Sequence, residues 1–226
     1  MRFECNSLTF TYPGADKPVL EDLSFSMNTP GFNAVFGPSG AGKTSFARLV
    51  AGSGKEDCLG FHGISTVLYS YNQERLPGWS STGSHLDKVC AADKQRLKSE
   101  LIQIFRLESL MGSRFSQLSM GQQNRMNLIR YLIQDFDLLI LDESLANVDE
   151  ALREIIILAM KRMFPDKLFL YISHNLLEVA RFCREILILG TSDRGSLIVQ
   201  GQDYAQGYEL DKKSLNRTML EIMNAV

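Results

Sequence analysis

The 226-residue chain has little of what marks secreted, membrane-spanning or nucleic-acid-binding proteins. Its four cysteines (Cys5, Cys58, Cys90 and Cys183) are scattered, so they predict neither a metal site nor disulfides and fit a reducing compartment. The net charge of -2 gives no sign of a nucleic-acid partner. Its longest apolar runs, such as EIIILAM, are too short to cross a bilayer, and MRFECNSLTF lacks the apolar stretch of a signal peptide. Any membrane role is therefore expected to come through a partner.

The composition that remains is ordinary for a globular protein, at 45% hydrophobic and 22% charged residues. Apolar runs and alternating patterns predict strands at residues 7–12, 18–27, 32–37, 64–73, 137–143 and 167–174. Helical patterns follow at residues 44–52, 85–107, 120–134, 149–164 and 212–226, with a hairpin around 192–195. Strands that alternate with helices predict a largely parallel α/β sheet, and the block from about residue 76 to 134 is predicted to be all helical.

A glycine-rich segment between a predicted strand and a predicted helix carries the strongest chemical signal. The residues GPSGAGKT, from Gly37 to Thr44, match the pattern G-x-x-x-x-G-K-[ST] in the context that this motif requires. Its glycines let backbone amides approach phosphate oxygens, Lys43 can reach the terminal phosphates, and Thr44 offers a hydroxyl to Mg²⁺. A glycine-rich turn with a chance lysine is the alternative, but the pattern arises by accident in roughly one chain in a hundred. The sequence predicts nucleotide binding.

Polar side chains end two further buried strands. DLLILDE ends in Asp142, which can hold Mg²⁺ through water, and Glu143, which can polarise an attacking water; KLFLYISH ends in His174. Taken singly, the two acids could cap the next element and the histidine could be structural. Because the carboxyl ends of parallel strands share one sheet edge, these groups and the glycine-rich loop are expected to converge, which favours a catalytic interpretation. The signal from Gln73, at the end of VLYSYNQ, is weaker, since an amide there can simply satisfy backbone groups.

The segment QLSMGQQNR begins another predicted helix. Ser119 and Gln122 are three residues apart ahead of the apolar run MNLIRYLI, which is the spacing of a capping box. By themselves these residues predict only a well-capped helix start.

The order GPSGAGKT, Gln73, LSMGQ, DLLILDE, SLANVD and His174 resembles the ATP-binding subunit of ABC transporters over nearly the whole chain. The resemblance implies an α/β fold: a P-loop NTPase core with a mostly parallel sheet, a small antiparallel β-subdomain and an all-helical insert. Because the stretch between the Lys43 helix and Gln73 is short, we expect this β-subdomain to be reduced in size. It also implies three parts. Residues 1–75 would form the β-subdomain and phosphate-loop region, 76–134 the helical subdomain, and 135–226 the rest of the core. ATP and Mg²⁺ are the implied cofactors, and ATP hydrolysis coupled to transport is the implied activity.

The resemblance assigns roles position by position. Tyr12 matches the aromatic residue that stacks on adenine. Alternatively, as a strand residue on the same face as Phe10, Tyr12 could belong to the hydrophobic core. Ser119 and Gly121 would bind the γ-phosphate of ATP held by another subunit, so each site would close only in a head-to-tail dimer. The implied catalytic residues are Glu143, His174 and Gln73, and the implied Mg²⁺ ligands are Thr44, Gln73 and Asp142. The implied nucleotide-binding residues are Tyr12, Gly37, Pro38, Ser39, Gly40, Ala41, Gly42, Lys43, Thr44, Ser45, Ser119, Gly121, Gln122 and Asp149.

The implied partners are a second copy of the chain or a homologous ATPase subunit, and membrane permease subunits that dock near residues 73–89. No nucleic acid is expected. Trp79, the only tryptophan, would lie on the docking surface or pack under its own helical insert. The subunit would be peripheral at the cytoplasmic face of the inner membrane.

Import of a small solute is favoured because QERLPGW resembles importers of small anions, with Gly78 interrupting the match. An exporter subunit or a regulator that transports nothing stays open as an alternative. Relatives acting on DNA or ribosomes usually carry a coiled-coil insertion or two ATPase halves, and neither is found here. Three departures from the family pattern stand out: Met120 in the signature, Ser144 where proline is usual, and NVD at residues 147–149.

Overall fold

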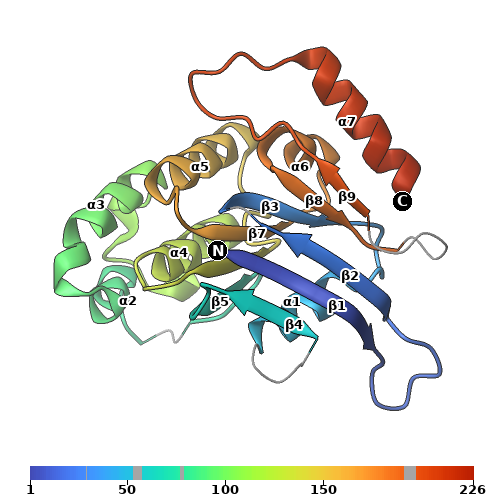
Figure 1. The fold of residues 1–226 in the computed structure, drawn as a ribbon. Helices are drawn as coiled ribbons and strands as arrows, with labels where there is room; N and C mark the ends of the chain where they lie inside the picture. Colours follow the sequence, from blue (N-terminus) through green and yellow to red (C-terminus); the bar gives the residue numbers. More distant parts are fainter. Residues whose placement is uncertain (29, 53–57, 77–78, 191–196) are drawn as a thin grey trace.

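The computed structural model describes residues 1–28, 30–52, 58–76, 79–190 and 197–226 (Figure 1). Its larger sheet has six strands in the order β5-β6-β7-β3-β8-β9. Their bounds are Val67–Tyr71, Leu138–Asp142, Leu168–Ile172, Gly31–Phe36, Glu185–Ile188 and Leu197–Gln200. The first five strands are parallel and β9 is antiparallel. Every residue of β6 and β7 is buried, as expected for apolar strands covered on both faces.

A second, three-stranded sheet pairs β2-β1-β4 in antiparallel fashion. These strands span Leu20–Met27, Arg2–Phe10 and Leu59–His62. This sheet corresponds to the small antiparallel β-subdomain that the resemblance implies. The four-residue β4 was not predicted, because a strand this short carries too few alternating positions to give a pattern. The first strand ends at Phe10, two residues before Tyr12.

The helices are α1 (Lys43–Ala51), α2 (Thr82–Val89), α3 (Gln95–Ile104), α4 (Met120–Leu132), α5 (Glu150–Met163), α6 (Leu176–Phe182) and α7 (Lys212–Ala225). The predicted helical run 85–107 is broken at Cys90, where the backbone is extended. The seven-residue α6 was not predicted. From residue 79 to 134 the structure contains helices and turns and one isolated bridge, between Ser81 and Arg114. The predicted hairpin corresponds to β8 and β9, while its turn at 192–195 lies outside the described residues.

The two faces of the parallel sheet are covered differently. On one face, Val35 and Ile140 pack with Phe46 of α1 and with the antiparallel sheet. On the other face, Ala34 and Leu141 pack against α4, α5, α6 and α7, and this core continues into α2 and α3. Figure 1 shows α2 and α3 at the left edge of the molecule and α7 at the top. The predicted α/β fold class is confirmed. Among the described helices, none is both long and apolar enough to span a bilayer.

Neighbouring strands bring the predicted chemical groups to one sheet edge. Strands β6, β7 and β3 are adjacent, and Ile172 pairs with both Asp142 and Val35. Beyond that row, the chain continues into Glu143 after β6, His174 after β7 and Gly37 after β3. The order of strands therefore places all three groups at the carboxyl edge of the sheet, where α/β proteins bind ligands.

Candidate active site

A cleft of about 410 Å³ lies at this edge. It is lined by residues that are far apart in the sequence and that the fold brings together. These are Tyr12, Val19, Ser39, Gly40, Gly42, Lys43, Thr44, Ser45, Glu143, Ile172 and His174. Nine of the eleven were predicted site residues. Val19 and Ile172 were missed because single apolar residues in a strand pattern give no signal of a binding role.

The glycine-rich loop turns from β3 into α1 around Gly42. This residue caps α1 in a left-handed conformation with φ 88°, which favours glycine. A Cβ atom at Gly42 would also lie 2.8 Å from Leu20 and 2.9 Å from Val19. Both requirements favour glycine here. Lys43, Thr44 and Ser45 of the first turn of α1 line the cleft, and the unpaired amides of a helix start favour an anion.

Lys43 is nearly buried, at 6% exposure, within the loop. Its Nζ atom donates hydrogen bonds to the carbonyl oxygens of Gly37 at 2.8 Å and Pro38 at 2.7 Å. Desolvation lowers the pKa of Lys43, while the nearby charges of Glu143 and Asp142 act in the opposite direction. A lysine held in this way presents a poorly solvated positive charge, which binds phosphate oxygens strongly.

Glu143 and His174 face each other at the mouth of the cleft. His174 Nε2 contacts Glu143 Oε1, and both side chains are partly exposed. The Glu143 backbone is left-handed, with φ 53°, and its amide donates to the carbonyl of Ile172 at 3.1 Å. Both residues also line a neighbouring cavity of about 180 Å³. A carboxylate and an imidazole in contact beside a phosphate-binding loop can orient and deprotonate a water.

Asp142 lies deeper in the site and is 6% exposed. One of its oxygens, Oδ2, accepts a hydrogen bond of 2.8 Å from the hydroxyl of Tyr69. Burial, followed by the charge of Asp142, raises the pKa of Tyr69, so the phenol stays protonated as a donor. The sequence analysis did not identify Tyr69, since an aromatic residue in a strand is the usual core pattern.

The residues present fit a magnesium ion only in combination with a nucleotide. Among the described residues, no group of three or more His, Cys, Asp or Glu could hold a metal. Mg²⁺, however, normally uses one or two protein oxygens and completes its shell with water and phosphate oxygens. The Thr44 hydroxyl in the cleft and the Oδ1 atom of Asp142 are oxygens of the required kind.

Tyr12 lies on the cleft wall and not in the core. Its side chain is 42% exposed, its hydroxyl is hydrogen-bonded to Ser45 Oγ at 2.8 Å, and its ring meets Phe10 edge-on with centroids 4.9 Å apart. The alternative that Tyr12 is core is therefore wrong. An exposed aromatic face beside a phosphate-binding loop is suited to stacking on a base.

Gln73 is exposed, with a left-handed φ of 64°, and is not among the residues that line the cleft. Both of its neighbours are tied down. Asn72 donates its backbone amide to the carbonyl of Asp142 at 3.0 Å. Glu74 receives hydrogen bonds from α4, at its carbonyl from Asn127 and at its carboxylate from Tyr131. Gln73 therefore projects from a turn held at both ends.

The start of α4 carries the predicted capping box. The backbone amide of Gln122 donates to Ser119 Oγ at 3.3 Å, and the backbone amide of Ser119 donates to Gln122 Oε1 at 2.8 Å. Asp149 likewise caps α5 by accepting from the amide of Leu152 at 2.9 Å. Ser119, Gln122 and Asp149 do not line the cleft that contains Lys43.

Gly121 packs directly against the loop between Glu143 and Asp149. A Cβ atom at Gly121 would lie 2.1 Å from the carbonyl oxygen of Asn147, so a larger residue requires a backbone shift. Ser144, at the position of the expected proline, is 1% exposed and donates to the carbonyl of Ser70 at 2.8 Å. This departure from the family pattern thus adds a bond between β5 and the loop.

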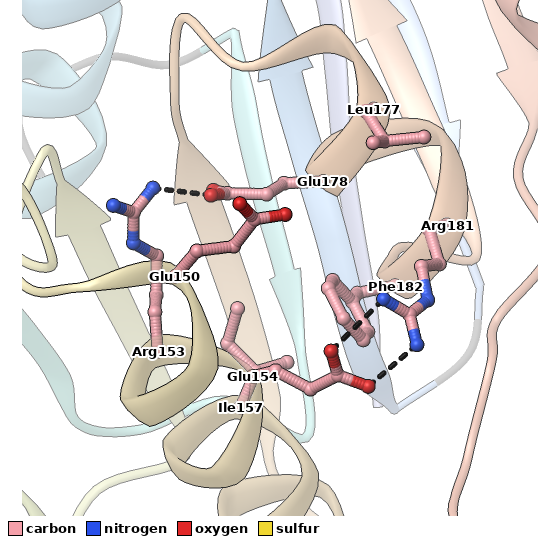
Figure 2. A pocket seen from close by; sticks show the side chains of 8 residues that line it. All are labelled: Glu150, Arg153, Glu154, Ile157, Leu177, Glu178, Arg181 and Phe182. Carbon is pink, nitrogen blue, oxygen red and sulfur yellow. Dashed lines mark hydrogen bonds and ion pairs between the residues drawn. The ribbon is translucent and has the colours of Figure 1, made fainter.

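Two ion pairs join α5 to α6 (Figure 2). Arg153 contacts the buried Glu178 carboxylate and also donates to the carbonyl of Val148 at 2.6 Å. Glu178 accepts further hydrogen bonds, from Tyr171 at 2.9 Å and from Asn175 at 3.1 Å. Because Asn175 follows His174, these contacts fix the turn that carries the histidine. Neither Arg153 nor Glu178 was predicted, since each looks like an ordinary charged position on a helix.

The family model described as "ABC transporter" matches residues 20–146, more than half of the chain. This chain belongs to the ABC transporter family. The predicted family is confirmed, and so is the predicted class of subunit, an ABC-type ATPase.

Curated ABC transporter relatives are identical to this chain at slightly over a quarter of the aligned positions. The molybdenum import ATP-binding protein ModC of Saccharophagus degradans is 27% identical over 215 residues, which cover 86% of this chain and 58% of ModC. The taurine import ATP-binding protein TauB of Pseudomonas putida is 28% identical over 227 residues, covering 90% of this chain and 86% of TauB. The Nod factor export ATP-binding protein I of Rhizobium etli is 29% identical, covering 84% of this chain and 65% of that protein.

Solved structures of ABC proteins share the fold. An ATP-binding subunit of an ABC transporter superposes with a TM-score of 0.79 at 20% identity, covering 99% of this chain and all of that one. An ATP-binding cassette solved as a dimer with ADP and Pi superposes with a TM-score of 0.72 at 19% identity, covering 88% of this chain and 99% of that one. At these identities the likeness establishes the P-loop NTPase fold.

Proposed function

We propose that this chain hydrolyses ATP as the nucleotide-binding subunit of an ABC transporter and powers import of a small solute through partner membrane subunits. The observation that carries the proposal is the contact between Glu143 and His174 at the mouth of the Lys43 cleft. That cleft combines a phosphate-binding loop with a carboxylate and an imidazole at the position where a water would attack a terminal phosphate.

Each group in the cleft has a separate task. The amides at the start of α1 and Lys43 bind the phosphates, and the Tyr12 ring packs against the base. Thr44, Asp142 and Gln73 would hold Mg²⁺, which would neutralise charge on the phosphate oxygens. Glu143 polarises the attacking water, and His174 orients Glu143 through their contact.

The site is proposed to be completed by a second subunit. Ser119, Gly121, Gln122 and Asp149 lie outside the cleft of their own chain, although α4 begins with free amides suited to an anion. A head-to-tail dimer would place this helix start on the γ-phosphate held by the partner. ATP binding would then close the dimer and hydrolysis would open it.

Replacing Glu143 by glutamine tests the catalytic assignment. The amide keeps the shape of the side chain but cannot accept a proton, so turnover should fall about 10²–10⁴-fold while ATP affinity stays nearly unchanged. Glu143→Gln should therefore accumulate as an ATP-bound dimer on gel filtration. The matched control is Glu100→Gln on the exposed face of α3, which should hydrolyse ATP at the normal rate. Near-normal hydrolysis by Glu143→Gln would remove this residue from the role.

We propose that the surface around residues 73–89 docks the membrane subunits from the cytoplasmic side. Trp79 supports this placement because its side chain is 80% exposed, and exposed tryptophans are enriched among interface hot spots. The alternative of packing under its own helical insert conflicts with that exposure.

Trp79→Ala should leave the free subunit folded and able to bind ATP while weakening co-purification with the membrane subunits. Tyr208→Ala is the control, because Tyr208 follows β9, is 74% exposed, and lies outside the proposed docking surface. Unfolding of the Trp79 variant, or equal loss of assembly in both variants, would contradict the docking role.

Import is proposed because the chain matches ModC and TauB, both named as import subunits, over 86% and 90% of its length. The match to a Nod factor export protein over 84% of the chain keeps export as the second candidate. Reconstitution with the membrane subunits in vesicles separates the two, because ATP on the side of this chain would move solute toward it for import and away from it for export.

A further inference from the structure

Asn124, on the second turn of α4, is a buried polar residue at the meeting point of three segments. Its side chain is 3% exposed. The Nδ2 atom donates one hydrogen bond to Asn72 Oδ1 at 2.9 Å and another to the carbonyl of Ala146 at 2.8 Å. Both hydrogens of the amide are therefore used. Because the carbonyl of Ala146 can only accept, it fixes which way the Asn124 amide points.

Each segment that meets at Asn124 carries residues of the proposed ATP site. Asn72 immediately precedes Gln73. Ala146 lies in the loop between Glu143 and Asp149. Asn124 itself stands one turn beyond Gly121, whose Cα packs against the same loop at Asn147. The side chain of Asn124 thus connects the start of α4 to the two loops that serve the nucleotide of its own chain.

Helix α4 also holds the other side of Gln73. Asn127 donates to the carbonyl of Glu74 at 2.8 Å, Tyr131 donates to its carboxylate at 2.9 Å, and Arg130 forms an ion pair with the same carboxylate. A shift of α4 would therefore displace the turn that carries Gln73 as well. Asn124 differs from these three residues because one of its hydrogen bonds reaches the 143–149 loop.

We propose that Asn124 is a positioning residue that couples the two ATP sites of the head-to-tail dimer. The start of α4 serves the partner's nucleotide, and Gln73 and Glu143 serve the chain's own, so a fixed Asn124 junction makes closure at one site set the geometry of the other. This inference rests on the proposed function. Neither hydrogen-bond partner of Asn124 lines the Lys43 cleft, so the proposed role is exerted through the loops and not on ATP itself.

Substituting Asn124 by aspartate tests the junction with almost no change of shape. An aspartate has no donor for the carbonyl of Ala146, whereas Asn72 can rotate its own amide and donate to the new carboxylate. The change therefore breaks mainly the link to the 143–149 loop. The Asn124→Asp substitution is made in the Glu143→Gln background, so that ATP-driven pairing can be measured with little turnover. Two quantities are measured: ATP affinity of the monomer, at a protein concentration below pairing, and the ATP concentration for half-maximal pairing.

We expect Asn124→Asp to raise the ATP concentration for half-maximal pairing about tenfold and to change monomer affinity by less than about twofold, because the part-buried carbonyl of Ala146 loses the Asn124 donor. Thr218→Val is the matched control. Thr218 is 5% exposed, lies on α7 far from the junction, and its hydroxyl donates to the carbonyl of Gln200 at 3.3 Å. This control should lose stability without shifting the half-maximal ATP concentration.

A second variant keeps the test decisive if Asn124→Asp fails to fold. Asn72→Ala removes the other partner at a less buried position and should shift the half-maximal ATP concentration in the same direction by about threefold. Unchanged pairing in both variants, or an equal shift in Thr218→Val, would overturn the coupling role and leave Asn124 as a folding residue. If the Glu143→Gln parent itself does not pair with ATP, the head-to-tail proposal fails, and the Asn124 inference falls with it.

Discussion

The two helix starts at Lys43 and Met120 both offer free amides to an anion, yet the structure treats them differently. The start of α1 forms part of a walled cleft together with Tyr12, Glu143 and His174. The start of α4 is exposed at Ser119 and Met120, its capping box is complete, and it lines no part of that cleft. A helix start becomes a binding site within one chain only when other segments enclose it. In the head-to-tail dimer proposed above, a partner chain would supply the missing walls for the start of α4.

The largest expected effect comes from separating the two helix starts onto different chains. Lys43→Ala should abolish ATP binding to its own loop, and Ser119→Arg should block the approach of a partner to the start of α4. Each variant alone should pair poorly. Their mixture should recover ATP-driven pairing, because one mixed site combines the intact loop of the Ser119→Arg chain with the intact α4 start of the Lys43→Ala chain. Energy transfer between differently labelled chains measures this pairing.

The control for the mixed dimer is ATP binding by the isolated Ser119→Arg chain, which should match that of the unaltered protein because no cleft residue is changed. If Ser119→Arg abolishes ATP binding by its own chain, the start of α4 is a capped helix start needed for folding and not half of a partner's site.

A smaller effect is expected at Gly121, where α4 meets the Glu143–Asp149 loop. A Cβ at this position would lie 2.1 Å from a backbone oxygen, so Gly121→Ala should lower the free energy of unfolding by about 1–3 kcal/mol. Gly112→Ala is the matched control, because no atom lies within 4 Å of its Cβ position, and it should change stability by less than about 0.5 kcal/mol. Urea unfolding measures both. Equal stability of the two variants would mean that the loop moves freely away from α4.

The smallest expected effect concerns the wall of the cleft at Tyr12. Tyr12→Phe removes only the hydroxyl bonded to Ser45 and should change ATP affinity by less than about twofold. Tyr12→Ala also removes the ring and should weaken binding by about 0.5–1.5 kcal/mol. Fluorescent-nucleotide titration distinguishes them, and the same changes should leave affinity for inorganic triphosphate unaltered. A loss shared by triphosphate would place Tyr12 at the phosphates and not at the base.

Local patterns in the sequence were sufficient where one segment contains its own cause. The helix that follows the glycine-rich loop, the capping box at Ser119 and Gln122, and the buried strands β6 and β7 all depend on residues close together in the chain. The resemblance to ABC ATP-binding subunits then predicted which of these segments share a site. The sequence patterns missed short elements such as β4 and α6, because four to seven residues carry too little periodicity.

The sequence by itself determined the phosphate loop and the type of fold, since these follow from local spacing and from the alternation of strands and helices. It indicated the family through the resemblance of its motif order to ABC ATP-binding subunits. Only the tertiary structure decided the contacts made between distant segments: Tyr69 on Asp142, Asn124 between Asn72 and Ala146, and Gly121 against Asn147. The hydrogen-bonded pairs among these contacts are separated by 22 to 73 residues along the chain. No local pattern encodes such pairs, because they form only once the strand order has brought β5, β6 and α4 together.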